Sequence, residues 1–177
     1  MSPLCYDKAT GALRVRQSQA MSEYNLEFAE AMAESSGLIL RSNSLPEEGQ
    51  RAALYTALVA CEIALKYALA QAGVSVPKTH DLSKLIGLVS DFSVEVEFTK
   101  GITKRLPASR IRGVSVSDSY RDATLGRLLE AEEFGASKFP NEIRYGHTLE
   151  HFPASVMQQA SLQLIAWVRR HAPSIQA

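Results

Sequence analysis

The chain has 177 residues, of which 46% are hydrophobic and 21% charged, values typical of a globular domain and not of a disordered chain. Lysine and arginine number 19, as do aspartate and glutamate, so the overall charge points to neither a nucleic-acid nor a membrane partner. No run of about 18 apolar residues suggests a transmembrane helix, and the first residues lack the apolar core of a secretory signal. Because the two cysteines, Cys5 and Cys61, suit a reducing compartment, we expect a soluble cytoplasmic protein without membrane contact.

The amino-terminal part of the chain predicts an extension followed by a helix. Residues 1–20 show no hydrophobic period and are interpreted as a loosely held extension. From Met21 onward, apolar side chains recur at every fourth position, which is typical of an amphipathic helix. The run Ser-Ser-Gly at 35–37 predicts the end of this helix, and residues 42–49 a connector.

The strongest helical pattern in the chain covers residues 50–72. Leucine and alanine dominate it, and both favour helix. Glu62 and Lys66 stand four positions apart, in the better orientation for a helical ion pair. Gly73 is expected to end this helix. A third helix is expected from Thr79, as its N-cap, to about Asp91.

An insertion at about residues 93–118 separates the predicted helices. Apolar and polar residues alternate from 94 to 99, which indicates a strand, and residues 114–116 suggest a second one. The first 99 residues have a charge balance of −4 and the remainder +4, so an RNA chain is one interpretation of the basic stretch. The alternative is a solvated loop that docks on the acidic first half. The candidate RNA-binding residues are Lys100, Lys104, Arg105, Arg110 and Arg112.

The remaining segments complete an all-α fold. A helix is predicted over residues 119–136, and a last helix with Pro153 at its first position. Together the elements predict an up-and-down bundle of four or five helices with a short irregular or β-containing insertion. We expect a domain over residues 21–171 and a C-terminal tail at 172–177.

Three short segments, in this order, resemble the HEPN family. They are the helical Glu62–Lys66 pair, the run His80-Asp81-Leu82, and the run Ile143-Arg144-Tyr145. The resemblance implies a helical bundle that usually forms a homodimer. Many HEPN domains are metal-independent ribonucleases, often toxins paired with a nucleotidyltransferase-type antitoxin, whereas others bind a nucleotide or a partner protein without catalysis.

The resemblance also implies which residues carry the chemistry. Active members have an arginine, four to six intervening residues and then a histidine, a pattern that Arg144 and His151 fit with six. Arginine presents a charged fork to phosphate oxygens, and histidine transfers protons near neutral pH. Gly146 stands where the family often has proline after Arg-Tyr. Possible supporting residues are His147, Tyr145, Glu62 and Lys66.

Plainer interpretations of these residues stay open. Arg144 would also suit a surface ion pair with Glu142 or Glu150, and His80 could pack or cap a helix start. In a single helix the ends of the row from Arg144 to His151 would lie about 10 Å apart, so a dimer mate would help to close the site. With no HExxH pattern and no cysteine cluster, we expect neither a metal nor a cofactor.

Overall fold

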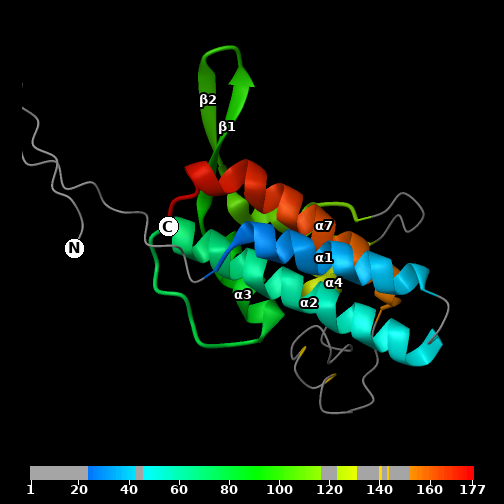
Figure 1. Cartoon of the computed structure of the whole chain (residues 1–177). Helices are drawn as coiled ribbons and strands as arrows, with labels where there is room; N and C mark the ends of the chain where they lie inside the picture. Colours follow the sequence, from blue (N-terminus) through cyan, green and yellow to red (C-terminus); the bar gives the residue numbers. More distant parts are fainter. Residues whose placement is uncertain (1–23, 43–45, 117–122, 131–139, 141–142, 144–151) are drawn as a thin grey trace, which may run out of the picture.

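The computed structural model describes residues 24–42, 46–116, 123–130, 140, 143 and 152–177. Within these residues the longer helices pack side by side, and a two-stranded hairpin projects away from them (Figure 1). The helices are α1 (Leu26–Arg41), α2 (Pro46–Gln71), α3 (Leu82–Ser90), α4 (Leu125–Glu130) and α7 (Ala154–His171), with 3-10 turns η1 (Ala108–Gly113) and η2 (Ala172–Ser174). The strands are β1 (Ser93–Thr99) and β2 (Ile102–Pro107).

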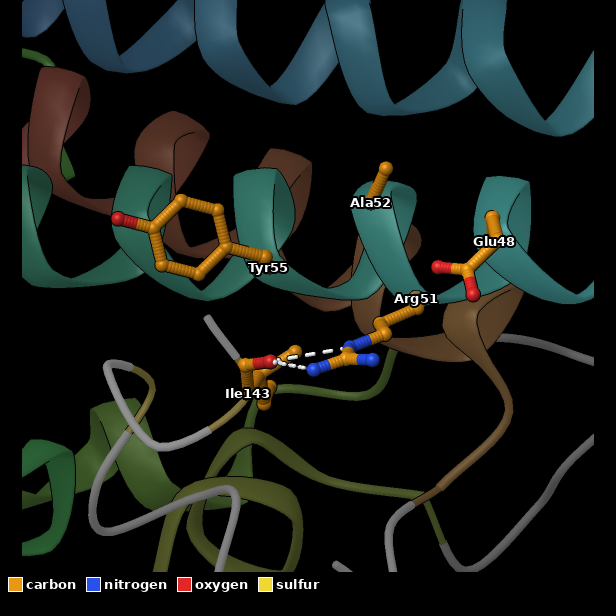
Figure 2. A pocket seen from close by; sticks show the side chains of 5 residues that line it. All are labelled: Glu48, Arg51, Ala52, Tyr55 and Ile143. Carbon is orange, nitrogen blue, oxygen red and sulfur yellow. Dashed lines mark hydrogen bonds between the residues drawn. The ribbon is translucent and has the colours of Figure 1, made fainter. Parts of the chain in front are cut away.

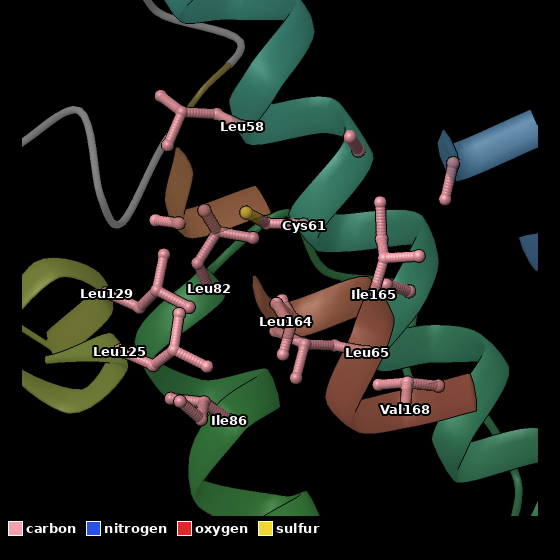
Figure 3. Close-up of a cluster of buried hydrophobic side chains, with 14 of the residues drawn as sticks. Leu58, Cys61, Leu65, Leu82, Ile86, Leu125, Leu129, Leu164, Ile165 and Val168 are labelled. Carbon is pink, nitrogen blue, oxygen red and sulfur yellow. The ribbon is translucent and has the colours of Figure 1, made fainter. Parts of the chain in front are cut away.

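Helix α2 is the centre of the bundle and contacts α1, α3 and α7. Its leucines and Cys61 meet apolar side chains from α3, α4 and α7 in one continuous core (Figure 3). Residues 47–71 are long and apolar enough to cross a membrane, but 67% of their most apolar window is buried inside the bundle. This burial is what a core helix requires, and the predicted helical bundle with a β-containing insertion is confirmed.

Helix α1 continues through the Ser-Ser-Gly run where the sequence predicted its end. Ser36 is fully buried and its hydroxyl donates to the Ala53 carbonyl at 2.7 Å. A Cβ on Gly37 would come within 3.1 Å of the Gln158 amide nitrogen. The small residues therefore allow α1 to pack closely against α2 and α7. The connector predicted at 42–49 is too long, because α2 already begins at Pro46.

The boundaries of α2 and α3 follow ordinary capping chemistry. Gly73, with a φ of +76°, follows the end of α2 as predicted, because glycine adopts this conformation without steric cost. The predicted N-cap of α3, Thr79, is wrong: the cap is Asp81, whose carboxylate accepts from the Lys84 amide at 2.9 Å. The Thr79 hydroxyl oxygen instead accepts a hydrogen bond from the Asp81 amide at 3.1 Å.

The insertion contains the predicted first strand, but its second strand lies elsewhere. Gly101, with a φ of +81°, permits a tight turn after β1, so the chain returns directly as β2 within the basic stretch. Ser115 makes only an isolated bridge with Thr124, so the predicted strand at 114–116 is wrong. Helix α4 lies inside the helix predicted at 119–136. The predicted start is too early, because Ala123 and Thr124 are not helical and Thr124 bridges to Ser115; the other residues of that range lie outside the described part.

The carboxyl-terminal residues are packed onto the bundle. Pro153 is the N-cap of α7 and not its first residue. Beyond α7, Ile175 is 5% exposed, and Gln176 exchanges backbone hydrogen bonds of 2.9 and 3.0 Å with Ser93 at the base of the hairpin. The end of the chain thus fixes the root of β1 against the helices.

Candidate functional site

The predicted pair of Glu62 and Lys66 forms an ion pair, and it is buried. The Lys66 ammonium donates to the Glu62 carboxylate at 2.8 Å, and the two side chains are 7% and 11% exposed. The ammonium also lies 5.4 Å from the centre of the Tyr24 ring, within the range of a cation–π contact. Burial of two charges is costly, so this pair needs further polar contacts.

His80 supplies the next contact. Its Nδ1 lies 3.0 Å from both carboxylate oxygens of Glu62, although the side chain of His80 is 55% exposed. The cap of α3 at Asp81 fixes the chain one residue later. We call Glu62, Lys66 and His80 the Glu62 cluster.

The Glu62 cluster has the arrangement of an oriented acid–base group. A carboxylate that accepts from Nδ1–H fixes the tautomer and orientation of the imidazole, and leaves Nε2 to exchange a proton with a ligand. Lys66 supplies a positive charge 2.8 Å from the buried carboxylate. Sequence reasoning assigned His80 to a helix start; its place directly before Asp81 in the HEPN-like run was the available signal.

A second polar site lies nearer the beginning of α2. The Arg51 guanidinium donates to the Ile143 carbonyl at 3.0 Å from Nε and at 2.5 Å from Nη2 (Figure 2). This contact borders a pocket of about 350 Å³ that Glu48, Arg51, Ala52, Tyr55 and Ile143 line. At 100° per residue, Arg51 and Glu62 differ by about 20° around the helix axis and by roughly 16 Å along it. Both sites therefore lie on one side of α2.

The segment that carries the predicted catalytic residues lies outside the described residues. Its four predicted site residues are Arg144, Tyr145, His147 and His151. The residues that flank it are described: Ile143 is 4% exposed and held by Arg51, and Phe152 packs against the core. The chain is thus attached to the bundle immediately before and immediately after this segment.

The structure separates the predicted RNA-binding cations into two groups. Arg112 donates to the Glu130 carboxylate at 2.8–2.9 Å. This hydrogen bond raises the pKa of Arg112, and burial offsets only part of the increase. Arg105 contacts Glu95 at 3.9 Å and the Gln176 side chain. The other three, Lys100, Lys104 and Arg110, are exposed and have no carboxylate partner among the described residues.

The fold and the site define a class of protein, a helical bundle whose long central helix carries a buried Glu–Lys pair beside a histidine. The family model of the HEPN domain matches residues 22–135. This span is more than half of the chain, so the protein belongs to the HEPN family. The match includes the Glu62 cluster and the hairpin, and ends before Arg144. Neither a curated protein nor a solved structure matches the chain.

Proposed function

We propose that this protein is a metal-independent endoribonuclease of the HEPN family. In the proposed reaction the 2′-hydroxyl attacks the adjacent phosphate, the bond to the 5′-oxygen breaks, and the products are a 2′,3′-cyclic phosphate and a 5′-hydroxyl. The step needs one group to accept the 2′ proton, another to protonate the leaving oxygen, and a cation on the phosphate. The observation that carries the proposal is the Glu62 cluster, in which a buried carboxylate orients a half-exposed imidazole.

The proposed roles divide among three residues. Arg144 binds the phosphate, because a guanidinium stays charged and fits two phosphate oxygens at once. His151 and His80 supply the two proton transfers, since histidine is the side chain best suited to give and take a proton near neutral pH. The contact of Arg51 with Ile143 supports this assignment, because it fixes the chain directly before Arg144 on the same side of α2 as the Glu62 cluster.

The alternative proposal is a non-catalytic HEPN domain that binds a nucleotide or a partner protein. The observation that favours it is that the Glu62 carboxylate is already satisfied by Lys66 and His80. In this interpretation the contact between Glu62 and His80 only holds the loop that precedes α3 against α2. In that case, removal of His80 would alter stability and leave any ligand binding unchanged.

Cleavage of a labelled single-stranded RNA in the presence of EDTA tests the proposal. We expect products that end in a 2′,3′-cyclic phosphate, and a loss of at least about 100-fold in rate for Arg144→Ala and for His151→Ala. His80→Gln should lower the rate. The matched controls are Arg41→Ala, at an exposed arginine in the last turn of α1, and His171→Gln, at a histidine in the last turn of α7. A wild-type protein that leaves RNA intact, or alanine variants as active as wild type, would refute the proposal.

The partners implied by the family remain proposals for this chain. We propose a homodimer, which would place two copies of Arg144 and His151 near one another, and light scattering at micromolar concentration would measure its mass. We also propose a nucleotidyltransferase-type antitoxin as the partner in the cytoplasm. Co-expression with the product of the adjacent gene, followed by growth measurement, tests this pairing.

A further inference from the structure

The hairpin is fixed at its root and free of the bundle toward its turn. Val94 in β1 is 3% exposed, and the Ala108 amide donates to the Phe92 carbonyl at 2.8 Å where the strands leave the helices. The strands then project away from the bundle (Figure 1). Near the turn, Phe98 is 72% exposed and Ile102 is 60% exposed. Two large apolar side chains are therefore exposed close together in sequence at the end of an arm, which suits a contact surface.

One face of the hairpin is apolar, and it becomes progressively more exposed with distance from the core. Alternation along β1 places Val94 and Val96 on the same face. The pairing is irregular between Glu97 and Thr99, but the Phe98 ring lies beside the Lys104 ammonium and therefore belongs to this face as well. The register adds Leu106 opposite Val94 and Lys104 opposite Val96. Val94 is buried and Val96 half-buried, whereas Phe98 is mostly exposed. The core therefore explains the inner part of this face and leaves the outer part unoccupied.

The outer part of this face combines an aromatic ring with cations. The Lys104 ammonium lies 5.9 Å from the centre of the Phe98 ring. No acidic residue occurs from position 98 to position 117 in the sequence. The carboxylates of β1 belong to the opposite face of the hairpin. There Glu95 lies opposite Arg105 in the strand register and contacts it at 3.9 Å, and Glu97 lies opposite Thr103. Lys104 is thus a positive group beside an exposed ring, and Lys100 lies in the turn that follows β1. Neither has a carboxylate partner in the described part of the chain.

We propose that the end of the hairpin binds a single strand of RNA, with Phe98 stacked on a base and Lys100 and Lys104 on the flanking phosphates. An exposed aromatic ring accepts the face of any base, and neighbouring cations follow the phosphates. A second copy of this chain would cover the apolar ring, but the excess of positive charge around Phe98 favours a polyanion. The choice of RNA rests on the proposed function, but the proposed hairpin site includes neither Arg144 nor His151.

Fluorescence anisotropy with a labelled single-stranded RNA tests the inference, in a His151→Ala background that prevents cleavage. We expect Phe98→Ala to raise the Kd about tenfold, as loss of one stacked base does, and Phe98→Tyr to restore most of the affinity. Lys104→Ala should raise the Kd and reduce its dependence on salt. Matched controls are Phe28→Ala, which removes another exposed phenylalanine on α1, and Lys84→Ala, on α3.

Each outcome decides between distinct interpretations. A Kd that changes less than about twofold in Phe98→Ala, or that rises equally in Phe28→Ala, overturns the hairpin site while cleavage by the wild-type protein still supports the proposed function. Hairpin-dependent binding without any wild-type cleavage supports the hairpin site and refutes the nuclease. A change from dimer to monomer in Phe98→Ala, with RNA affinity retained, would show that the hairpin contacts a second copy and would overturn the inference.

Discussion

Replacement of Glu62 by leucine tests whether the Glu62 cluster holds a buried charge. In the variant, the Lys66 ammonium, whose side chain is 7% exposed, loses its carboxylate partner and keeps the cation–π contact with the Tyr24 ring. Removal of one member of a buried ion pair costs about 3–5 kcal/mol in the free energy of unfolding. For a domain of this size that loss corresponds to a decrease in Tm of roughly 6–20 °C.

A double-mutant cycle separates the buried charge from simple loss of packing. Lys66→Met alone should also destabilise the protein, because the Glu62 carboxylate is then buried beside His80 only. The double variant Glu62→Leu/Lys66→Met should recover stability to within about 1 kcal/mol of wild type, since well-packed apolar residues often replace a buried pair without loss. Urea unfolding followed by far-UV circular dichroism measures all four proteins. His80→Gln is the control and should cost no more than about 1.5 kcal/mol, because the histidine is half exposed.

Two results would refute this reasoning. One is a loss below about 1 kcal/mol for Glu62→Leu, which is the range of an exposed ion pair. The other is a double variant no more stable than either single variant. That result would indicate that the two side chains stabilise the fold through packing and not through their charges.

Three further predictions concern packing and titration. Gly126→Ala should destabilise the protein by about 1–3 kcal/mol, because the new Cβ would lie 2.9 Å from the Cβ of Arg112. The Cys61 thiol should resist alkylation at pH 8 in the folded protein and react in urea, because burial raises its pKa to about 12. Burial, and then the nearby charge of Arg170, lowers the pKa of His171. The unfolded state therefore binds the proton more tightly, and the folded state should lose stability as the pH falls below about 6.5.

Matched variants control these measurements. Gly113→Ala introduces a methyl group with no atom within 4 Å and should leave the Tm almost unchanged. Cys5→Ser leaves Cys61 as the only thiol, so rapid alkylation of the folded variant would contradict its burial. His171→Gln should reduce the loss of stability between pH 7.5 and pH 5.5, and an identical loss in both proteins would assign the effect to other groups.

Local patterns in the sequence were sufficient wherever a helix buries one face. The apolar repeat of residues 50–72 matches α2 closely, because a stripe that recurs every three to four residues can be buried only as a helix. The same reasoning failed at Ser-Ser-Gly, since the run looks like a helix end in isolation. Contact with Ala53 and Gln158, which are distant in sequence, makes small residues an advantage there.

The sequence by itself determined the helical class, the central helix and the Glu62–Lys66 spacing, because each depends on residues within a few turns of one another. It also determined the HEPN-like order of motifs, which is a property of the linear chain. Only the tertiary structure decided that this ion pair is buried and that His80, 18 residues away, contacts its carboxylate. It also decided which cations are engaged, since Arg112 meets Glu130 through the fold while Lys100 and Lys104 are carried outward on a hairpin. The residue types fix the charge and the hydrogen-bonding capacity of each side chain. Whether a side chain is buried, and which partner it contacts, is fixed only when distant segments of the chain pack together.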